Sequence, residues 1–202
     1  MTWAVLTGDV VHSSDLSQDG LELAFDTLKD AAQDMADWPS IGTTAFARRG
    51  GDGWQIALDH PALHLRSALF LQARLAAQDP PCATRIAVAT GAGSIPGDMD
   101  LNGAHGPAFT QSGRLLEALS GRSRLGFATP GPVGAVYALA DHIAQGWTQA
   151  QARSLALVLP PDGRPRRDAA AQLGISRQAV DQALWAAGYP FIEAALAQLE
   201  VK

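Results

Sequence analysis

Short apolar runs that stop at glycine alternate with longer amphipathic stretches through the first 145 residues, and this alternation constrains the fold most. Trp3–Gly8 is short, apolar and followed by Asp9, which predicts a buried strand. Leu21–Trp38 repeats its apolar side chains close to every 3.6 residues, which predicts a helix. Two strand-like runs within Thr43–Leu58 flank Gly50–Gly53, which is typical of a hairpin. The same criteria predict strands over 82–90 and 124–128 and helices over 61–77, 106–119 and 133–145. The order of these elements predicts an α+β fold.

The pattern changes after residue 146, where strand-like runs stop. Helices are predicted over 147–159, 166–173, 176–187 and 190–201. A chain of 202 residues has room for one substantial domain and a small module. We therefore expect an α+β domain over 1–146 and a small all-α domain over 147–202.

Composition excludes several classes of protein. The chain is 47% hydrophobic and 17% charged, which excludes a disordered or fibrous chain. No apolar run approaches the roughly 20 residues that span a bilayer, and the first residues do not resemble a signal peptide. We expect a cytoplasmic protein with no membrane partner. The single cysteine, Cys82, excludes an internal disulfide or a cysteine-rich zinc site, and we interpret it as structural.

Charge is distributed unevenly between the two parts. The first 147 residues contain nine Lys and Arg against fifteen Asp and Glu, whereas the last 55 contain six against five. Four arginines of the tail lie within fourteen positions: Arg164, Arg166, Arg167 and Arg177. Although the whole chain has a net charge of −5, a local basic patch of this kind can bind phosphate.

Spacing in the tail predicts a helix-turn-helix. Ala170 is small where two helices would touch, Gly174 tolerates positive φ four positions later, and Val180 is an apolar anchor six beyond that. Ser176 can cap the second helix and leave its N-terminus free to face a phosphate.

The outward residues of that second helix have side chains suited to DNA. Arg177, Gln178 and Gln182 can reach base edges, and Arg164, Arg166, Arg167 and Ser176 are placed to contact the phosphate backbone. Asp181 on the same helix is unfavourable because its carboxylate repels phosphate. The open alternative is a helical hairpin used for protein contacts or dimerisation.

Two aspartates of the first part follow strands. Asp9 ends the first strand and Asp52 lies at the tip of the hairpin. If the strand and the hairpin are neighbours in one sheet, both carboxylates project from the same end, an arrangement that suits Mg²⁺. The alternative is that both are ordinary Gly-Asp turn residues.

Four blocks resemble conserved segments of class III nucleotidyl cyclases in order and approximate separation. They are Asp9–Ser14, Arg48–Gly53, Arg85–Gly91 and Gly106–Leu115. Together with the tail, they resemble the SatD-like branch of that group, in which a cyclase-like domain precedes a helix-turn-helix.

The resemblance implies a ferredoxin-like, palm-type sheet and a homodimer that binds a nucleoside triphosphate or another nucleotide. It further implies that Asp9 and Asp52, helped by the Val10 carbonyl, bind Mg²⁺ or Mn²⁺. Arg114 would stabilise phosphate charge across the dimer interface, for which a guanidinium is suited. Arg48 would recognise the purine.

The chain departs from the family pattern at three positions. Arg48 replaces the usual lysine, and Thr110 replaces the ribose-orienting asparagine. Gly103 occupies the place of the acidic base-selecting residue, with Asp100 and Asn102 nearby but out of register. Of these we assign Thr110 to the catalytic set and Asn102 to nucleotide binding.

These observations predict a DNA-binding transcriptional regulator with a nucleotide- and metal-binding sensory domain of weak or no catalytic activity. The alternatives are an active cyclase that uses ATP or GTP, and a structural or toxin–antitoxin-like protein that binds neither nucleotide nor DNA.

Other notable residues favour plain interpretations. His12 and His105 are interpreted as polar neighbours of the site, and His60, His64 and His142 as surface or helix-end residues. Trp54 and Trp185 are predicted to lie in the core. The glycine-rich loop 91–97 lacks the lysine of a P-loop.

Overall fold

The structure is a computed structural model that describes residues 1–201. The strands are β1 (Thr2–Val10), β2 (Thr44–Arg49), β3 (Gly53–Leu58), β4 (Thr84–Ala92) and β5 (Leu125–Phe127). The helices are α1 (Gln18–Ala36), α2 (His64–Ala76), α3 (Pro107–Ala118), α4 (Pro132–Gln145), α5 (Gln149–Val158), α6 (Arg166–Leu173), α7 (Arg177–Ala186) and α8 (Tyr189–Leu199). A short 3₁₀ helix, η3 (Leu101–Gly103), precedes α3.

The first six elements make a βαββαβ unit. The sheet order is β2-β3-β1-β4-β5, with β1 antiparallel to both β3 and β4, and β2 antiparallel to β3. This is the ferredoxin-like arrangement, which confirms the predicted α+β fold class. β5 extends the sheet parallel to β4, and α3 and η3 lie in the connection between these two strands.

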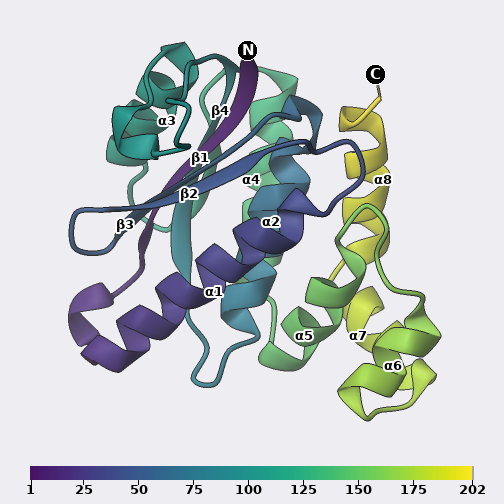
Figure 1. Ribbon diagram of the computed structural model, residues 1–202. Helices are drawn as coiled ribbons and strands as arrows, with labels where there is room; N and C mark the ends of the chain where they lie inside the picture. The colour runs from purple at the N-terminus through teal and green to yellow at the C-terminus, as the bar shows by residue number, and fades with distance from the viewer. Residues whose placement is uncertain (202) are drawn as a thin grey trace.

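Helices cover the two faces of the sheet unequally (Figure 1). One face packs on α1 and α2 through the even-numbered residues of β1, whose Ala4 and Leu6 are fully buried. The other face carries the odd-numbered residues and is covered in part by α3. There Trp3 and Val5 pack with Ala108 and Phe109. Because side chains alternate along a strand, this second face is also the one that receives Thr7 and Asp9.

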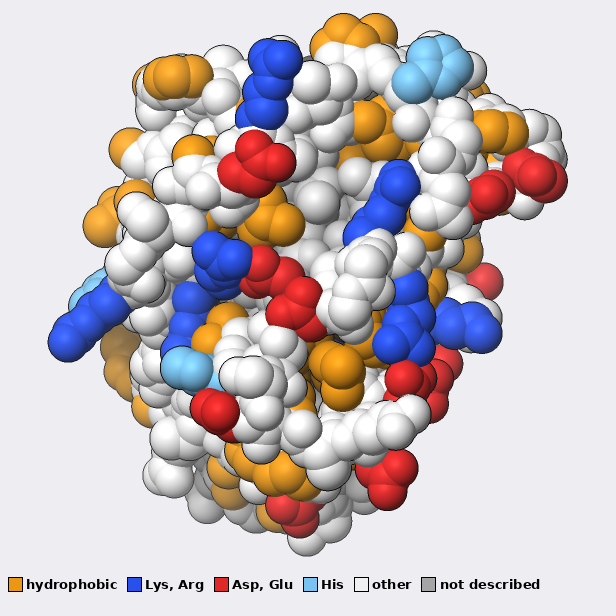
Figure 2. Space-filling view, turned by 90° about the vertical axis from the view of Figure 1, so that its left-hand side faces the viewer, with side chains coloured by type: hydrophobic (Ala, Val, Ile, Leu, Met, Phe, Trp, Pro, Cys, Tyr) orange, Lys and Arg blue, Asp and Glu red, His pale blue; other side chains and the backbone are white. Residues whose placement is uncertain are grey.

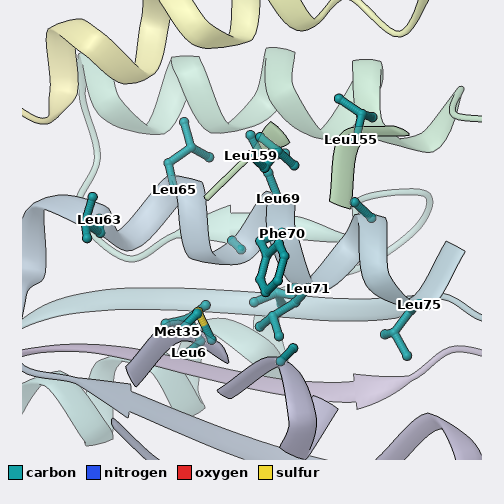
Figure 3. Close-up of a cluster of buried hydrophobic side chains, with 14 of the residues drawn as sticks. Leu6, Met35, Leu63, Leu65, Leu69, Phe70, Leu71, Leu75, Leu155 and Leu159 are labelled. Carbon is teal, nitrogen blue, oxygen red and sulfur yellow. The ribbon is translucent and has the colours of Figure 1, made fainter. Parts of the chain in front are cut away.

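The main core continues from the sheet into the tail. Figure 3 shows buried side chains of α2 between the sheet and α1 on one side and Leu155 and Leu159 on the other. The predicted boundary at 146–147 falls between α4 and α5, where Thr148 and Gln151 form a reciprocal capping box. The tail nevertheless shares one hydrophobic cluster with the sheet domain, so it is packed on α2 rather than tethered by a free linker.

Within residues 1–201, none of the helices combines the length and the hydrophobicity that crossing a membrane requires.

Candidate functional site

A close packing of Trp54 on Gly8 positions the end of β1. The Trp54 side chain is fully buried, and a Cβ at Gly8 would lie 2.3 Å from its ring, so only glycine fits there. The Trp54 indole also donates to Thr84 Oγ1 at 2.8 Å, and that hydroxyl contacts the Asp9 carbonyl. These contacts fix the register in which Asp9 lies opposite Gly53.

The structure therefore brings Asp9 and Asp52 to the same end of adjacent chain segments. The Val10 amide donates to the Asp52 carbonyl at 3.1 Å, which continues the β1–β3 pairing by one residue. Figure 2 views this side of the molecule, where acidic and basic side chains gather near the middle of the face.

Asp9 does not present a free carboxylate. Arg85 Nε donates to Asp9 Oδ1 at 2.8 Å, and Arg85 Nη2 donates to Oδ2. The third nitrogen, Nη1, donates to the carbonyl of Leu119 after α3, at 3.0 Å. This hydrogen bond to Asp9, followed by the charges of Asp9 and Asp52, raises the pKa of Arg85, so its guanidinium stays charged at physiological pH.

The carboxylates of Asp9 and Asp52 are of a type that suits a divalent cation, but most of their oxygen atoms are already hydrogen-bonded. Carboxylate oxygens are the ligands that Mg²⁺ prefers. Both Asp9 oxygens already accept from Arg85, and Asp52 Oδ2 accepts from Ser13 Oγ at 2.5 Å. In the described part of the chain, no three His, Cys, Asp or Glu side chains are grouped to bind a metal. A cation would have to compete with the Arg85 guanidinium for Asp9.

A chain of polar side chains crosses the same face, and the sequence analysis missed it. Arg49 Nη2 donates to Gln55 Oε1 at 2.7 Å, and Gln55 Nε2 donates to Thr7 Oγ1 at 2.9 Å. Thr7 Oγ1 lies 2.7 Å from Ser112 Oγ, which donates to the Phe109 carbonyl. The two-residue period from Asp9 back to Thr7 was the available signal.

Arg48 and Arg49 point to opposite faces of β2. Arg48 forms an ion pair with Glu22 of α1 at 2.7 Å and stacks over the Phe25 ring at 3.8 Å, so it faces the helical layer. Arg49 faces the side of Asp9 and donates to Asn102 Oδ1 at 3.3 Å. Arg48 and Asn102 both border a hollow of about 490 Å³ at the edge of β2, with Asp26 and Lys29. The structure thus brings the two predicted nucleotide-binding residues near each other but leaves Arg48 tied to α1.

Thr110 and Arg114 lie one turn apart on the exposed side of α3. Ala108 and Ser112 of the same helix are buried against the sheet. Thr110 and Arg114 consequently point away from Asp9 of their own chain.

The tail has the geometry of a helix-turn-helix at each position that the sequence singled out. Ala170 and Val180 are buried, and Gly174 ends α6 in the left-handed conformation with φ 66°. Ser176 caps α7 by accepting from the Ala179 amide at 3.1 Å.

The outer face of α7 exposes Arg177, Gln178 and Gln182. Asp181 on that helix is flanked by two arginines: Arg166 Nη1 lies 2.8 Å and Arg177 Nε 3.7 Å from its carboxylate oxygens. Its charge is therefore compensated locally, and it links α6 to α7. Arg167 pairs with its neighbour Asp168 and is largely exposed, while Arg164 lies in the loop before α6.

The expectation that Trp185 lies in the core is wrong. Trp185 is 67% exposed and contacts the exposed Phe191 ring at a centroid distance of 6.1 Å, because it faces outward on α7 beyond the Val180 and Leu184 seam. His64 begins α2 as expected of a helix-end residue, yet it is buried, since α4 covers it with Tyr137. Burial of Trp54 is confirmed.

The fold is that of an α+β protein with a ferredoxin-like sheet and an all-helical C-terminal region, in which α6 and α7 have the geometry of a helix-turn-helix. Among solved structures, the chain is similar to a bacterial light-regulated adenylyl cyclase, with 16% sequence identity and a TM-score of 0.45 over 62% of this chain and 74% of that one. No family model matches the sequence. No curated protein matches it either.

Proposed function

We propose that this protein is a DNA-binding regulator whose N-terminal domain is a cyclase-like sensory module, of the kind that the SatD-like resemblance implies, with little or no catalytic activity. The observation that carries the proposal is the helix-turn-helix itself. Its anchors Ala170 and Val180 are buried, its turn glycine is left-handed, and α7 begins at a capped N-terminus with Arg177 and Gln178 exposed beside it.

The charge pattern of the tail supports the same function. Asp181, the one carboxylate among the outward residues of α7, is compensated by Arg166 and Arg177. A phosphate that approaches this helix therefore meets guanidinium groups and amide donors rather than an isolated negative charge. A homodimer would present two such helices to paired half-sites about one helical turn apart.

The sheet face supports the proposal of weak or absent catalysis. The Asp9 carboxylate is fully occupied by Arg85, and Arg48 is paired with Glu22. We infer that a nucleotide with Mg²⁺ or Mn²⁺ binds near Asp52 with modest affinity, because a cation has to displace part of the Arg85 contact. This binding would serve sensing rather than turnover.

Selection from a pool of random-sequence DNA duplexes tests the main proposal. The full chain should enrich a defined motif, and Arg177→Ala and Gln178→Ala should lose that enrichment while they remain folded by circular dichroism. Arg122→Ala removes an arginine from an exposed position before β5, outside the tail, and should enrich the wild-type motif. Failure of the wild-type chain to enrich any motif would refute DNA recognition.

An active cyclase is the second candidate, and the register that places Asp9 opposite Gly53, next to Asp52, favours it. Incubation of the chain with labelled ATP or GTP and Mn²⁺ decides between the two. A cyclic product that disappears in Asp52→Ala and in Arg114→Ala would establish the enzyme.

A further inference from the structure

A cleft lies between the sheet domain and the tail. It has a volume of about 720 Å³, within the range of small-molecule sites. Its walls come from the end of α1, from α2 and α5, from the loop 160–164, and from the end of α6. None of the residues assigned to the sheet-face site borders this cleft.

The cleft has an aliphatic floor that lies over two buried aromatic rings. Trp38 and Phe70 meet edge to face beneath the cleft, with ring centroids 5.1 Å apart, but they are only 4% and 2% exposed, whereas Leu157 and Leu173 are partly exposed in the apolar lining. Apolar surface of this kind favours the body of an organic ligand over a hydrated ion.

Two guanidinium groups at the rim lack carboxylate partners. The third arginine of the rim, Arg74, forms an ion pair with Asp34 and lies over the Phe70 ring. By contrast, no ion pair within residues 1–201 includes Arg153 or Arg164, and the only hydrogen bond of the Arg153 side chain is a long one, 3.4 Å, to the Ala77 carbonyl. Each of these two groups can therefore bind a carboxylate.

The same rim also carries negative charge. Asp37 and Asp162 border the cleft along with the paired Asp34, so three aspartates face three arginines. This balance disfavours a highly charged ligand such as a triphosphate, because the site has no net positive field to offset several negative charges. A single carboxylate, paired directly with a guanidinium, suits it better.

We propose that this cleft binds a small organic monoanion with a flat apolar body, such as an aromatic ring, its carboxylate on Arg153 and Arg164 and its body against Leu157 and Leu173. The bound molecule bridges α2 of the sheet domain to Gln172 and Leu173 at the end of α6. Gly174 and α7 follow directly, so the ligand fixes the helix-turn-helix against the sheet domain. The cleft shares Arg164 with the predicted DNA contacts, but binding of the monoanion itself does not depend on the proposed DNA function, and only its regulatory consequence rests on that function.

Calorimetry of the full chain with indole-3-acetate and benzoate tests the site. We expect saturable binding of at least one of them, and Arg153→Gln should weaken it about tenfold, which corresponds to the loss of one charge-assisted hydrogen bond. Ala156→Leu, which adds volume to the wall of the cleft, should also weaken it. Arg122→Gln removes an arginine from another surface and should bind as the wild type does.

Several outcomes would overturn the proposal. They are the absence of binding by either carboxylate at millimolar concentration, equal binding by the neutral indole-3-acetamide, and binding that neither Arg153→Gln nor Ala156→Leu changes. Tighter binding of phenethylamine than of either carboxylate would assign the site to cations instead and would equally overturn it. These readouts need no DNA, so they are separable from a failure of the proposed function.

Discussion

At the scale of single residues, burial gives His64 an unusual titration. Its side chain is 7% exposed, lies 2.7 Å from the Tyr137 hydroxyl through Nδ1, and stacks on Phe127 at a centroid distance of 4.9 Å. Burial lowers the pKa of His64 to about 4. The folded chain therefore keeps this imidazole neutral at a pH where the unfolded chain protonates it.

The stability of the protein should consequently fall as the pH drops from about 6.5 to about 4. In this window the unfolded state binds one more proton at His64 than the folded state does, so acid favours unfolding. The decrease in the free energy of unfolding that is attributable to His64 is about 3 kcal/mol once the pH is below about 4. Urea unfolding of the wild type and of His64→Gln at a series of pH values measures it.

The pH dependence of His64→Gln should be flatter than that of the wild type, even if the variant is less stable at pH 7. His142→Gln replaces an exposed histidine of α4 and should keep the wild-type slope. A steep slope that survives in His64→Gln would assign the effect to other groups.

Under the proposed function, Arg85 limits the binding of a metal ion at Asp9. Arg85→Gln frees both Asp9 oxygens, so the affinity for Mn²⁺ should increase several-fold in calorimetric titrations. The free energy of unfolding should fall by about 1 kcal/mol, because the exposed part of the ion pair is screened by solvent. The double variant Asp9→Asn, Arg85→Gln should lose the gain in affinity. Unchanged Mn²⁺ affinity in Arg85→Gln would show that Asp9 is not a ligand.

At the scale of elements, alanine substitutions at two glycines separate the effect of backbone conformation on stability from the effect of packing. Gly174 adopts φ 66° between α6 and α7, whereas Gly113 lies within α3, and a Cβ at either position would meet nothing within 4 Å. Any difference between alanine substitutions at these two positions therefore reports the backbone alone.

Gly174→Ala should destabilise the protein by about 1 kcal/mol, because an L-residue is strained in the left-handed region. Gly113→Ala should stabilise it by about 0.5–1 kcal/mol, since alanine loses less backbone entropy in a helix. Chemical denaturation of both variants provides the measurement. Equal effects of the same sign would contradict the left-handed turn.

At the scale of the whole molecule, the tail is joined to the sheet domain by a buried ion pair as well as by the shared core. Arg66 of α2 is 9% exposed, and its Nε and Nη2 donate to the two carboxylate oxygens of Glu200 at 2.7 and 2.8 Å. Its Nη1 donates to the Leu159 carbonyl at 2.6 Å. The end of α8 is thereby fixed to α2.

We expect the chain to unfold in a single calorimetric transition, because the sheet domain and the tail share one hydrophobic core. Glu200→Gln should lower the temperature of that one transition by several degrees, since it leaves the buried Arg66 charge uncompensated. Glu117→Gln, at an exposed site of α3, should leave it unchanged. Two separate transitions in the wild type would show that the tail folds on its own.

Local patterns in the sequence were sufficient to predict the helices and strands and the turn between α6 and α7. Periodicity identified α1, the β2–β3 hairpin and the tail helices, because each depends on residues close in the chain. The left-handed Gly174 and the Ser176 cap followed from neighbours within a few positions. The placement of Asp9 and Asp52 at one end of the sheet also followed, since a hairpin tip and the end of an antiparallel neighbour meet there.

Tertiary structure alone decided which side chains face each other. The one-residue difference between Arg48 and Arg49 puts them on opposite faces of β2, and only the strand register shows that Arg48 turns toward α1. The pairing of Asp9 with Arg85, separated by 76 residues, likewise depends on β1 and β4 being neighbours. Sequence patterns report which face of an element is apolar, whereas the partner of a polar side chain is set by long-range packing, which no local pattern encodes.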